Sequence, residues 1–292
     1  MLEMLQLDFM QNALIAGILV SIACGVMGSL VVVNKLSSIA GGIAHASYGG
    51  VGLAVFLGFS PMLGSLGFSL LCAVLMGILT WKDRHRSDTL IGVIWALGMA
   101  LGVILTDLTP GYNGEMTSFL FGSILTVPRE LLSLMLVLLT IILITVSVFF
   151  KRLLSVSYDP EFARSRGERV LLLYMLLVSL VALTVVMAVQ AVGLILVIAL
   201  LTLPAFIAET YSRSLFSMMI IASVISLVLV VSGLFISYSL NLVTGVNYSM
   251  TIMQAEFCRV STPTASSVCS CSSRTRLRSS SSSAPSTLRG TR

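Results

Sequence analysis

The feature that most constrains this chain is a series of long apolar runs. A helix needs roughly 17–25 predominantly apolar residues to cross the hydrocarbon core of a bilayer. Runs of this length predict about eight helical spans, near Phe9–Val33, Ile39–Leu57, Met62–Trp81, Leu90–Thr106, Leu131–Phe150, Val170–Val189, Ala191–Ala208 and Leu215–Leu240. The runs are continuous rather than alternating, which favours helices over a β-barrel. The predicted fold class is all-α: a polytopic transmembrane bundle with a short cytoplasmic helix.

The composition agrees with a location in the lipid bilayer. Of the 292 residues, 57% are hydrophobic and 10% are charged, whereas soluble domains carry about 25% charged residues. The net charge is +5, but much of the basic excess lies in the C-terminal tail, so it does not indicate binding to nucleic acid. The first apolar run is too long for a cleavable signal peptide. The five cysteines show no spacing typical of a metal site.

Basic residues occur in alternate connections between the predicted spans. They lie at Lys35, at Lys82–Arg86, at Lys151–Arg169 and at Arg213, whereas Asp107–Glu115 is acidic. Cytoplasmic connections of membrane proteins carry an excess of Lys and Arg. One topology puts all the basic connections in the cytoplasm, and it places the N-terminus outside.

The longest external connection is Asp107–Glu130. It contains the turn-forming stretch Thr109–Gly114 and the apolar stretch Ser118–Val127, which is too short to span. This second stretch predicts a re-entrant or interfacial helix.

A block of small residues, Ser38–Gly52, lies in the second predicted span and contains one histidine, His45. Small residues let the backbones of neighbouring membrane helices approach closely. The glycines expected to pack in this way are Gly41, Gly42, Gly49 and Gly50, together with the GxxxG pair Gly98 and Gly102 of the fourth span. An ionisable side chain inside the membrane is rare and indicates a site. His45 is therefore either a ligand that lines a pathway or a packing residue that hydrogen-bonds a neighbouring carbonyl.

The largest cytoplasmic connection carries the signals of a short helix. Asp159 is a good N-cap, Pro160 suits the first helical position, and Glu161 favours the positive end of the helix dipole. Arg164 falls in the last turn, and Gly167 fits a left-handed C-cap. Caps at both ends favour a docking surface for a soluble partner over a flexible connector.

The character of the chain changes near residue 250. Residues 1–250 predict a transmembrane permease domain, and residues 251–292 form a tail rich in Ser and Arg that cannot bury a core. Eight spans that begin outside would leave this basic tail outside as well, against the charge rule. The tail is either disordered or the product of a shifted reading frame, or of a cloning artefact, that replaced a ninth helix.

Five blocks of sequence follow one another between Phe9 and Asn247. They are GGIAHASYGGVGLA (Gly41–Ala54), DTLIGVIWALGMALGVIL (Asp88–Leu105), FGSILTV (Phe121–Val127), YDPEFARSRG (Tyr158–Gly167) and VGLILVIALLTLPA (Val192–Ala205). Together they resemble the permease subunits of ABC importers for divalent metals, the family that carries zinc, manganese and iron(II).

The resemblance implies a permease of the inner (cytoplasmic) membrane that pairs with a second permease chain, identical or related. It also implies a cytoplasmic ABC ATPase and an extracytoplasmic metal-binding protein as partners. The residues that would couple to the ATPase are Asp159, Pro160, Glu161, Phe162, Ala163, Arg164 and Gly167. The chain has no GxxxxGK[ST] motif for phosphates. It is therefore expected to be a transport subunit rather than an enzyme, with no permanently bound cofactor and with ATP used by the partner.

The resemblance further implies transport by alternating access, with His45 on the metal path as a transient ligand. A path needs weak, exchangeable ligands, which a few groups provide better than a closed cage of four. Asp107 near the outer mouth is a second candidate ligand, although it can equally cap a helix or contact lipid headgroups. Tyr48, one turn from His45, is expected to line the same surface.

Two other functions fit parts of the sequence. Importers of haem, siderophore or cobalamin also use a capped cytoplasmic helix, but a bulky substrate requires a wider and more apolar cavity. A secondary transporter or channel needs no ATPase and usually shows inverted repeats and several charges inside the membrane, of which the predicted spans contain almost none. The sequence leaves the metal open, because zinc, manganese and iron(II) all accept imidazole and oxygen ligands.

Overall fold

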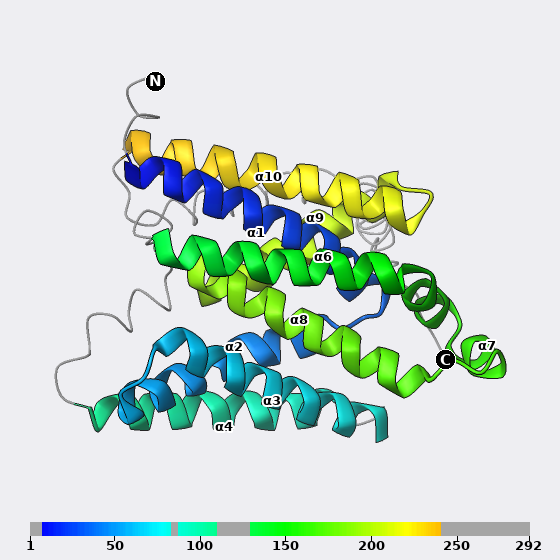
Figure 1. The fold of residues 1–292 in the computed structure, drawn as a ribbon, viewed down its shortest axis with the longest axis horizontal. Coiled ribbons are helices and arrows are strands. Elements are labelled where there is room, and N and C mark those ends of the chain that lie inside the picture. Colours follow the sequence, from blue (N-terminus) through cyan, green and yellow to red (C-terminus); the bar gives the residue numbers. More distant parts are fainter. Residues whose placement is uncertain (1–7, 83–86, 110–128, 241–292) are drawn as a thin grey trace, which may run out of the picture. The chain divides into compact units, whose positions relative to one another are not determined.

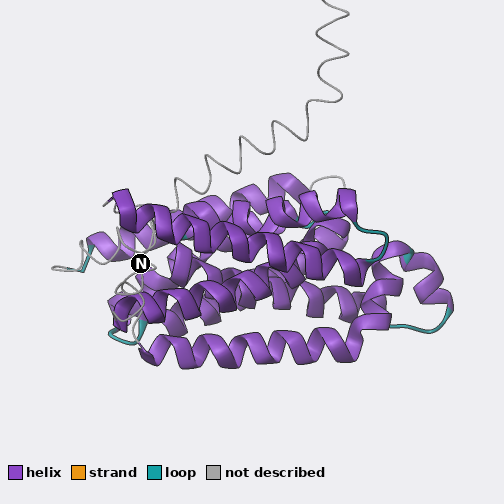
Figure 2. Ribbon diagram, turned by 90° about the horizontal axis from the view of Figure 1, so that it is seen from above, coloured by secondary structure: helices purple, strands orange, loops and turns teal. Residues whose placement is uncertain are grey.

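The computed structural model describes residues 8–82, 87–109 and 129–240, which consist of helices joined by turns (Figure 2). The helices are α1 (Asp8–Val33), α2 (Ser37–Leu57), α3 (Pro61–Lys82), α4 (Ser87–Asp107), α6 (Arg129–Tyr158), α7 (Pro160–Ser165), α8 (Val170–Val192), α9 (Leu194–Tyr211) and α10 (Leu215–Leu240) (Figure 1). The prediction of an all-α membrane bundle with one short extra helix is confirmed.

Seven of these helices are long and apolar enough to cross a membrane. The remaining predicted span corresponds to α9, whose apolar part, Leu196–Tyr211, is shorter than the others. Helix α9 nevertheless packs against α1, α8 and α10, and Leu201 and Ala205 on it are buried. It continues through Pro204 to Tyr211 instead of ending near Ala208 as predicted. Its place in the bundle therefore follows from packing rather than from length.

The sequence also predicted α6 too short. Its apolar run ends at Phe150, but the helix continues to Tyr158. The reason is a change in what the helix buries beyond the run: Leu153 is 2% exposed while Lys151 and Arg152 are exposed. The last two turns are thus a polar-faced extension that still packs on the protein.

The helices form two groups with α8 between them (Figure 1). Helix α2 packs on α3 and α4, while α1 packs on α6, α9 and α10. Helix α8 contacts members of both groups, α2 and α3 on one side and α1, α6 and α9 on the other. Residues from α8, such as Val181, Val185 and Met187, are completely buried, which is expected for a helix that is apolar all round.

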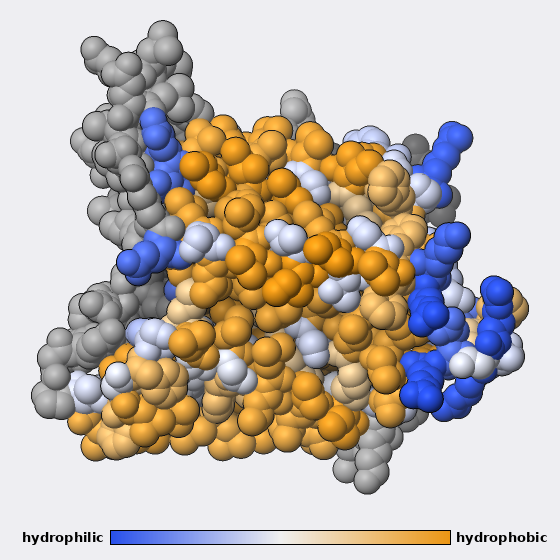
Figure 3. Space-filling model, in the orientation of Figure 1, coloured by the Kyte–Doolittle hydropathy of each residue, from blue (hydrophilic) through white to orange (hydrophobic). Residues whose placement is uncertain are grey.

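The outer surface divides into an apolar middle and hydrophilic ends. Figure 3 shows apolar side chains covering the middle of this face and hydrophilic ones gathering at its two ends, with the larger group at the end that carries α7. Exposed large apolar residues on α4, α6 and α10 contribute to the apolar part, for example Leu97, Val148 and Val228. The described basic connections, at Lys35, Lys151–Arg169 and Arg213, lie at the α7 end (Figure 1).

Several sequence predictions fall outside the described residues. They are the re-entrant or interfacial helix at Ser118–Val127, most of the turn-forming stretch Thr109–Gly114, the basic connection after Lys82 and the tail, residues 251–292.

Candidate functional site

Helix α2 lies closely against several neighbours because its surface is built from small residues. Most of Ile39–Ala54 is buried, in contact with α3, α4, α8 and α9. A Cβ atom added to Gly49 would lie 2.6 Å from the carbonyl oxygen of Gly98. One added to Gly52 would lie 2.7 Å from that of Gly102. The backbones of α2 and α4 are therefore in direct contact, which only small residues permit.

The other glycines of the block have different neighbours. A Cβ atom on Gly50 would lie 2.5 Å from the carbonyl oxygen of Gly64 on α3. One on Gly42 would lie 2.6 Å from the Ile91 side chain on α4. Gly41 differs, because its nearest neighbour is a side-chain carbon of α9 at 3.4 Å, an ordinary van der Waals distance. An alanine therefore fits at Gly41 but not at Gly42 or Gly50.

His45 lies where α2 meets the middle of α4. Its imidazole stacks on the Trp95 indole, with ring centroids 4.3 Å apart and the planes 12° from parallel (the two rings come from α2 and α4). The side chain is half-buried, and its Nδ1 atom is buried without a hydrogen-bond partner. The predicted packing role, a hydrogen bond to a neighbouring carbonyl, is thus not made through Nδ1. A buried nitrogen without a partner is costly and is able to accept a ligand.

Tyr48 lies on the same side of α2 as His45, also against α4. It is 6% exposed, and a Cβ atom on Gly102 would lie 2.5 Å from its Cδ1 atom. The Tyr48 ring therefore packs against Gly102 where α2 and α4 meet.

Asp107 is not brought near His45. It is the last residue of α4 and is exposed. It lies twelve positions after Trp95 along α4, which corresponds to roughly 18 Å at about 1.5 Å a residue. Among the described residues, no three His, Cys, Asp or Glu side chains are grouped as metal ligands. The candidates thus mark separate points along α2 and α4 rather than one cage.

Helix α7 has both predicted caps. The Asp159 carboxylate accepts hydrogen bonds from the backbone N–H groups of Glu161 and Phe162, each 3.0 Å long. At the other end, Gly167 has φ +80°. Its N–H donates to the Arg164 carbonyl, and the next N–H, that of residue 168, donates to the carbonyl of residue 163. This pair of bonds is the Schellman arrangement, so six helical residues are fixed at both ends.

One face of α7 is anchored and the other is open. Ala163 is 0% exposed and packs on the protein, whereas Phe162 is 53% exposed. Glu161 and Arg164 are exposed as well. A large aromatic side chain is thus presented outside the apolar middle of the bundle, between charges of both signs.

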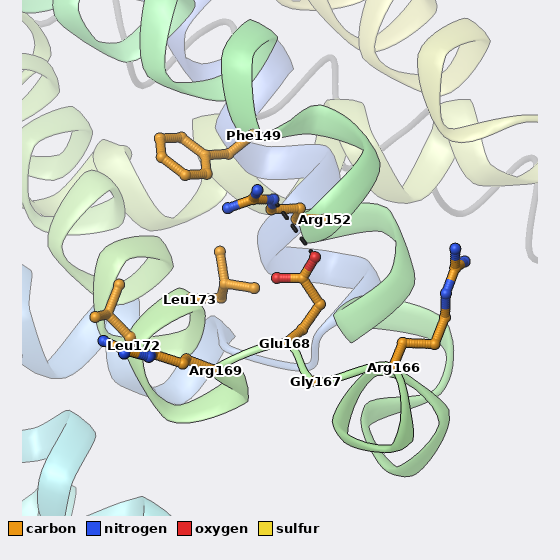
Figure 4. A pocket seen from close by; sticks show the side chains of 8 residues that line it. All are labelled: Phe149, Arg152, Arg166, Gly167, Glu168, Arg169, Leu172 and Leu173. Atoms are coloured by element: carbon orange, nitrogen blue, oxygen red, sulfur yellow. Dashed lines mark ion pairs between the residues drawn. The ribbon is translucent and has the colours of Figure 1, made fainter.

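Sequence reasoning missed three residues near these sites. Trp95, which covers the imidazole, lies in a uniformly apolar run that carries no signal for it. Arg152 and Glu168 form an ion pair, Nε to Oε1 at 3.4 Å, beside a cavity of about 450 Å³ (Figure 4). They are sixteen residues apart, and only the turn through α7 brings them together.

A second cavity of about 430 Å³ opens at the same end of the bundle. Its lining comes from α1, α2, α3, α4, α6, α7 and α8 and includes Lys35, Asp88 and Pro160. Asn34 beside it donates a 2.8 Å hydrogen bond to Ser157 and so ties the end of α1 to α6. This cavity lies next to α7, whose first residue, Pro160, is part of its lining.

Known proteins are similar to this chain in sequence over most of its length. Residues 6–262 match the model of the ABC 3 transport family. The chain is 51% identical over 245 residues to the uncharacterized membrane protein slr2045 of Synechocystis sp., covering 84% of this chain and 87% of that protein. It is 36% identical over 240 residues to the manganese import system permease protein ScaB of Streptococcus parasanguinis, covering 82% and 85%.

A solved structure has the same fold. It is PsaBC from Streptococcus pneumoniae in complex with Fab, with a TM-score of 0.79 and 34% sequence identity. The match covers 89% of this chain and 93% of that one. Since the family model matches most of the chain and the relatives are similar over most of their length, this protein belongs to the ABC 3 transport family.

Proposed function

We propose that this chain is the permease subunit of an ABC importer that moves a divalent transition metal, with manganese as the first candidate, into the cytoplasm. The observation that carries the proposal is the match to the family over residues 6–262. A relative named as a manganese import permease matches over 82% of the chain and supports the choice of cargo. Zinc and iron(II) remain the competing cargoes, because imidazole and oxygen ligands suit all three metals.

Energy for transport is supplied by a separate cytoplasmic ABC ATPase. Helix α7 is the proposed contact, because it is short, capped at both ends and presents Phe162 at its surface. A helix fixed in this way transmits a push instead of absorbing it. The nearby cavity, which Pro160 shares with residues of six other helices, offers a route from α7 to the spans.

The α7 end of the bundle is proposed to face the cytoplasm. The connections that contain Lys35, Arg213 and the arginines around α7 lie there, in accordance with the excess of basic residues in cytoplasmic connections. The protein is then a multi-pass protein of the cytoplasmic membrane with its N-terminus outside. Asp107, at the other end of α4, would meet the metal delivered by an extracytoplasmic binding protein.

His45 is the proposed transient ligand within the membrane. Its Nδ1 atom lies buried without a hydrogen-bond partner, and a single imidazole binds a metal weakly enough to release it. The path is completed by a second permease chain, identical or related, and ATP-driven alternating access opens it to each side in turn. Tyr48 supports the same stretch of α2 through its contact with Gly102.

The test is metal uptake into proteoliposomes that contain this chain, its ATPase and its binding protein, with ATP inside. Labelled manganese, zinc and iron(II) are offered in turn. We expect ATP-dependent accumulation of manganese, lowered about tenfold or more by His45→Ala, since even the partners of metal ligands contribute that much. His85→Ala, which removes the other histidine of the chain, is the matched control and should transport normally.

The other outcomes separate the alternatives. Accumulation without ATP would mean a channel or secondary transporter. Uptake of a metal chelate but of no free ion would mean a haem, siderophore or cobalamin importer. Normal uptake by His45→Ala would retain the importer and reduce His45 to a packing residue.

A further inference from the structure

The cavity beside the Arg152–Glu168 ion pair has a lining that neither metal transport nor ATPase docking explains. Three segments of the chain form it: the C-terminal part of α6, the turn after α7 and the start of α8 (Figure 4). Its volume is about 450 Å³, and its lining residues are Phe149, Arg152, Arg166, Gly167, Glu168, Arg169, Leu172 and Leu173. Polar and apolar residues both contribute to the lining.

The polar lining carries an excess of positive charge. Arg152, Arg166 and Arg169 contribute three guanidinium groups, and Glu168 contributes one carboxylate. The Glu168 carboxylate lies 3.4 Å from Nε of Arg152, which is long for a charge-assisted hydrogen bond. The Arg152 side chain is 58% exposed. Because guanidinium has five N–H donors in a fixed fork, Arg152 retains donors for a second oxyanion.

Arg152 and Arg169 are the arginines best placed to bind a ligand. In Figure 4 the Arg152 side chain extends toward the space below Phe149, and that of Arg169 extends beside Leu172. Arg166 is directed away from these residues in the same view, and its guanidinium carbon lies 5.8 Å from the centre of the Phe162 ring.

The backbone at the start of α8 adds to the preference for an anion. Arg169 occupies the N-cap position but makes no hydrogen bond there through its side chain. The N-terminus of a helix with 23 residues carries a partial positive charge. The start of α7, in contrast, has the Asp159 carboxylate as its cap.

The depth of the cavity matches that of lipid headgroups. Arg152 lies two residues beyond the apolar run of α6, and Arg169 directly precedes the apolar run of α8. On the apolar side, Leu172 is 54% exposed and its neighbour Leu171 is 47% exposed. The wall of the cavity is thus continuous with the lipid-facing surface, which a site for a free anion would not require.

We propose that this cavity binds an anionic phospholipid, with its headgroup between Arg152 and Arg169 and an acyl chain lying along Leu171 and Leu172. Basic pockets between spanning helices on the cytoplasmic side suit such headgroups. The lipid would connect the C-terminal part of α6 with the start of α8, the two helices that precede and follow α7 in the chain. The proposal concerns lipid binding alone and stands apart from the identity of the transported metal.

The test is lipid binding to the purified full-length chain, measured by native mass spectrometry with phosphatidylglycerol and phosphatidylcholine as probes. We expect tighter binding of phosphatidylglycerol, weakened about fivefold by Arg169→Gln and by Arg152→Gln, as expected for one basic residue near an anionic lipid. Arg169→Gln leaves the ion pair with Glu168 in place, so it separates ligand binding from folding. Lys151→Gln removes a neighbouring exposed charge that does not line the cavity, and it should weaken binding less than either arginine variant does.

A variant that should bind phosphatidylglycerol more tightly makes the test more specific. Glu168→Gln removes the one acidic group of the lining and should strengthen binding of phosphatidylglycerol, whereas a purely structural role for the ion pair predicts weaker binding. Equal affinities for wild type, Arg152→Gln and Arg169→Gln would overturn the proposal. So would competition by inorganic phosphate at the concentration of the lipid, which would indicate a free-anion site. Loss of ATPase binding in both variants with lipid binding unchanged would instead indicate a protein-docking surface.

Discussion

Helix α2 meets α4 through glycine backbones, whereas α7, which lies between α6 and α8 in the sequence, is capped by hydrogen bonds at both of its ends. In the first region a Cβ on Gly49 or Gly98 would lie within 3 Å of the facing backbone. In the second region Gly167 has open space around it, and its role is to adopt φ +80°. Side-chain volume therefore decides stability at α2–α4, and backbone conformation and capping decide it at α7.

The difference follows from the surroundings. Between spanning helices no water competes, and close packing is the main source of association. At the exposed α7, the N–H and C=O groups at the helix ends have no partners within the helix. The caps supply these partners and so fix where the helix begins and ends. Substitutions that are severe in one region should therefore be mild in the other.

The largest expected effect is at Gly98. Gly98→Leu places a side chain where a Cβ already lies 2.8 Å from the Cα atom of Ala46. We expect destabilisation by about 3 kcal/mol, the upper range for overpacking, seen as a lower thermal midpoint and a reduced folded yield in detergent. Gly92→Leu is the control on the same helix, because a Cβ there meets nothing within 4 Å. Equal midpoints for the two variants would contradict the close contact of α2 with α4.

The next effect is at the start of α7. Asp159→Ala removes the acceptor of two 3.0 Å hydrogen bonds and should cost about 1 kcal/mol of local stability. If α7 is the coupling helix, ATPase affinity falls and uptake falls with it. Asp159→Asn retains a capping side chain and should restore both. Failure of Asn to restore them would assign the role to the charge instead of the cap.

An effect of similar size is expected at Gly167. Gly167→Ala strains a left-handed residue by about 1 kcal/mol without any steric clash. Gly58→Ala is a matched control, because Gly58 has φ +76°, open space around it and a position at the end of α2. Both variants should lose similar stability in thermal unfolding. Only Gly167→Ala should weaken binding of the ATPase, and equal effects on that binding would separate α7 from coupling.

The smallest effect on stability is expected at the ion pair near α7. Glu168→Gln removes the contact with Arg152, which is 58% exposed, and exposed pairs contribute less than about 1 kcal/mol. The thermal midpoint should therefore shift less than in Asp159→Ala. A larger shift would show that the pair, rather than the caps, holds the connection from α6 to α8 in place.

The local features of this chain were predictable because their causes are local. The apolar runs determine the spans, and Asp159, Pro160 and Gly167 determine where α7 starts and stops. The glycines near His45 could be recognised as packing residues, but their partners could not. Which neighbour each one meets, Gly98 for Gly49 and Gly64 for Gly50, depends on how the helices assemble.

The sequence by itself thus determined that this is a helical membrane protein with one short, capped helix outside the spans. The tertiary structure alone decided which helices α9 packs against, that Trp95 covers His45 and that Asp107 lies far from both. It also brought Arg152 to Glu168 at the mouth of a basic cavity. The physical reason is that hydropathy and capping act within a few residues, whereas helix pairing depends on the shapes of surfaces distant in sequence.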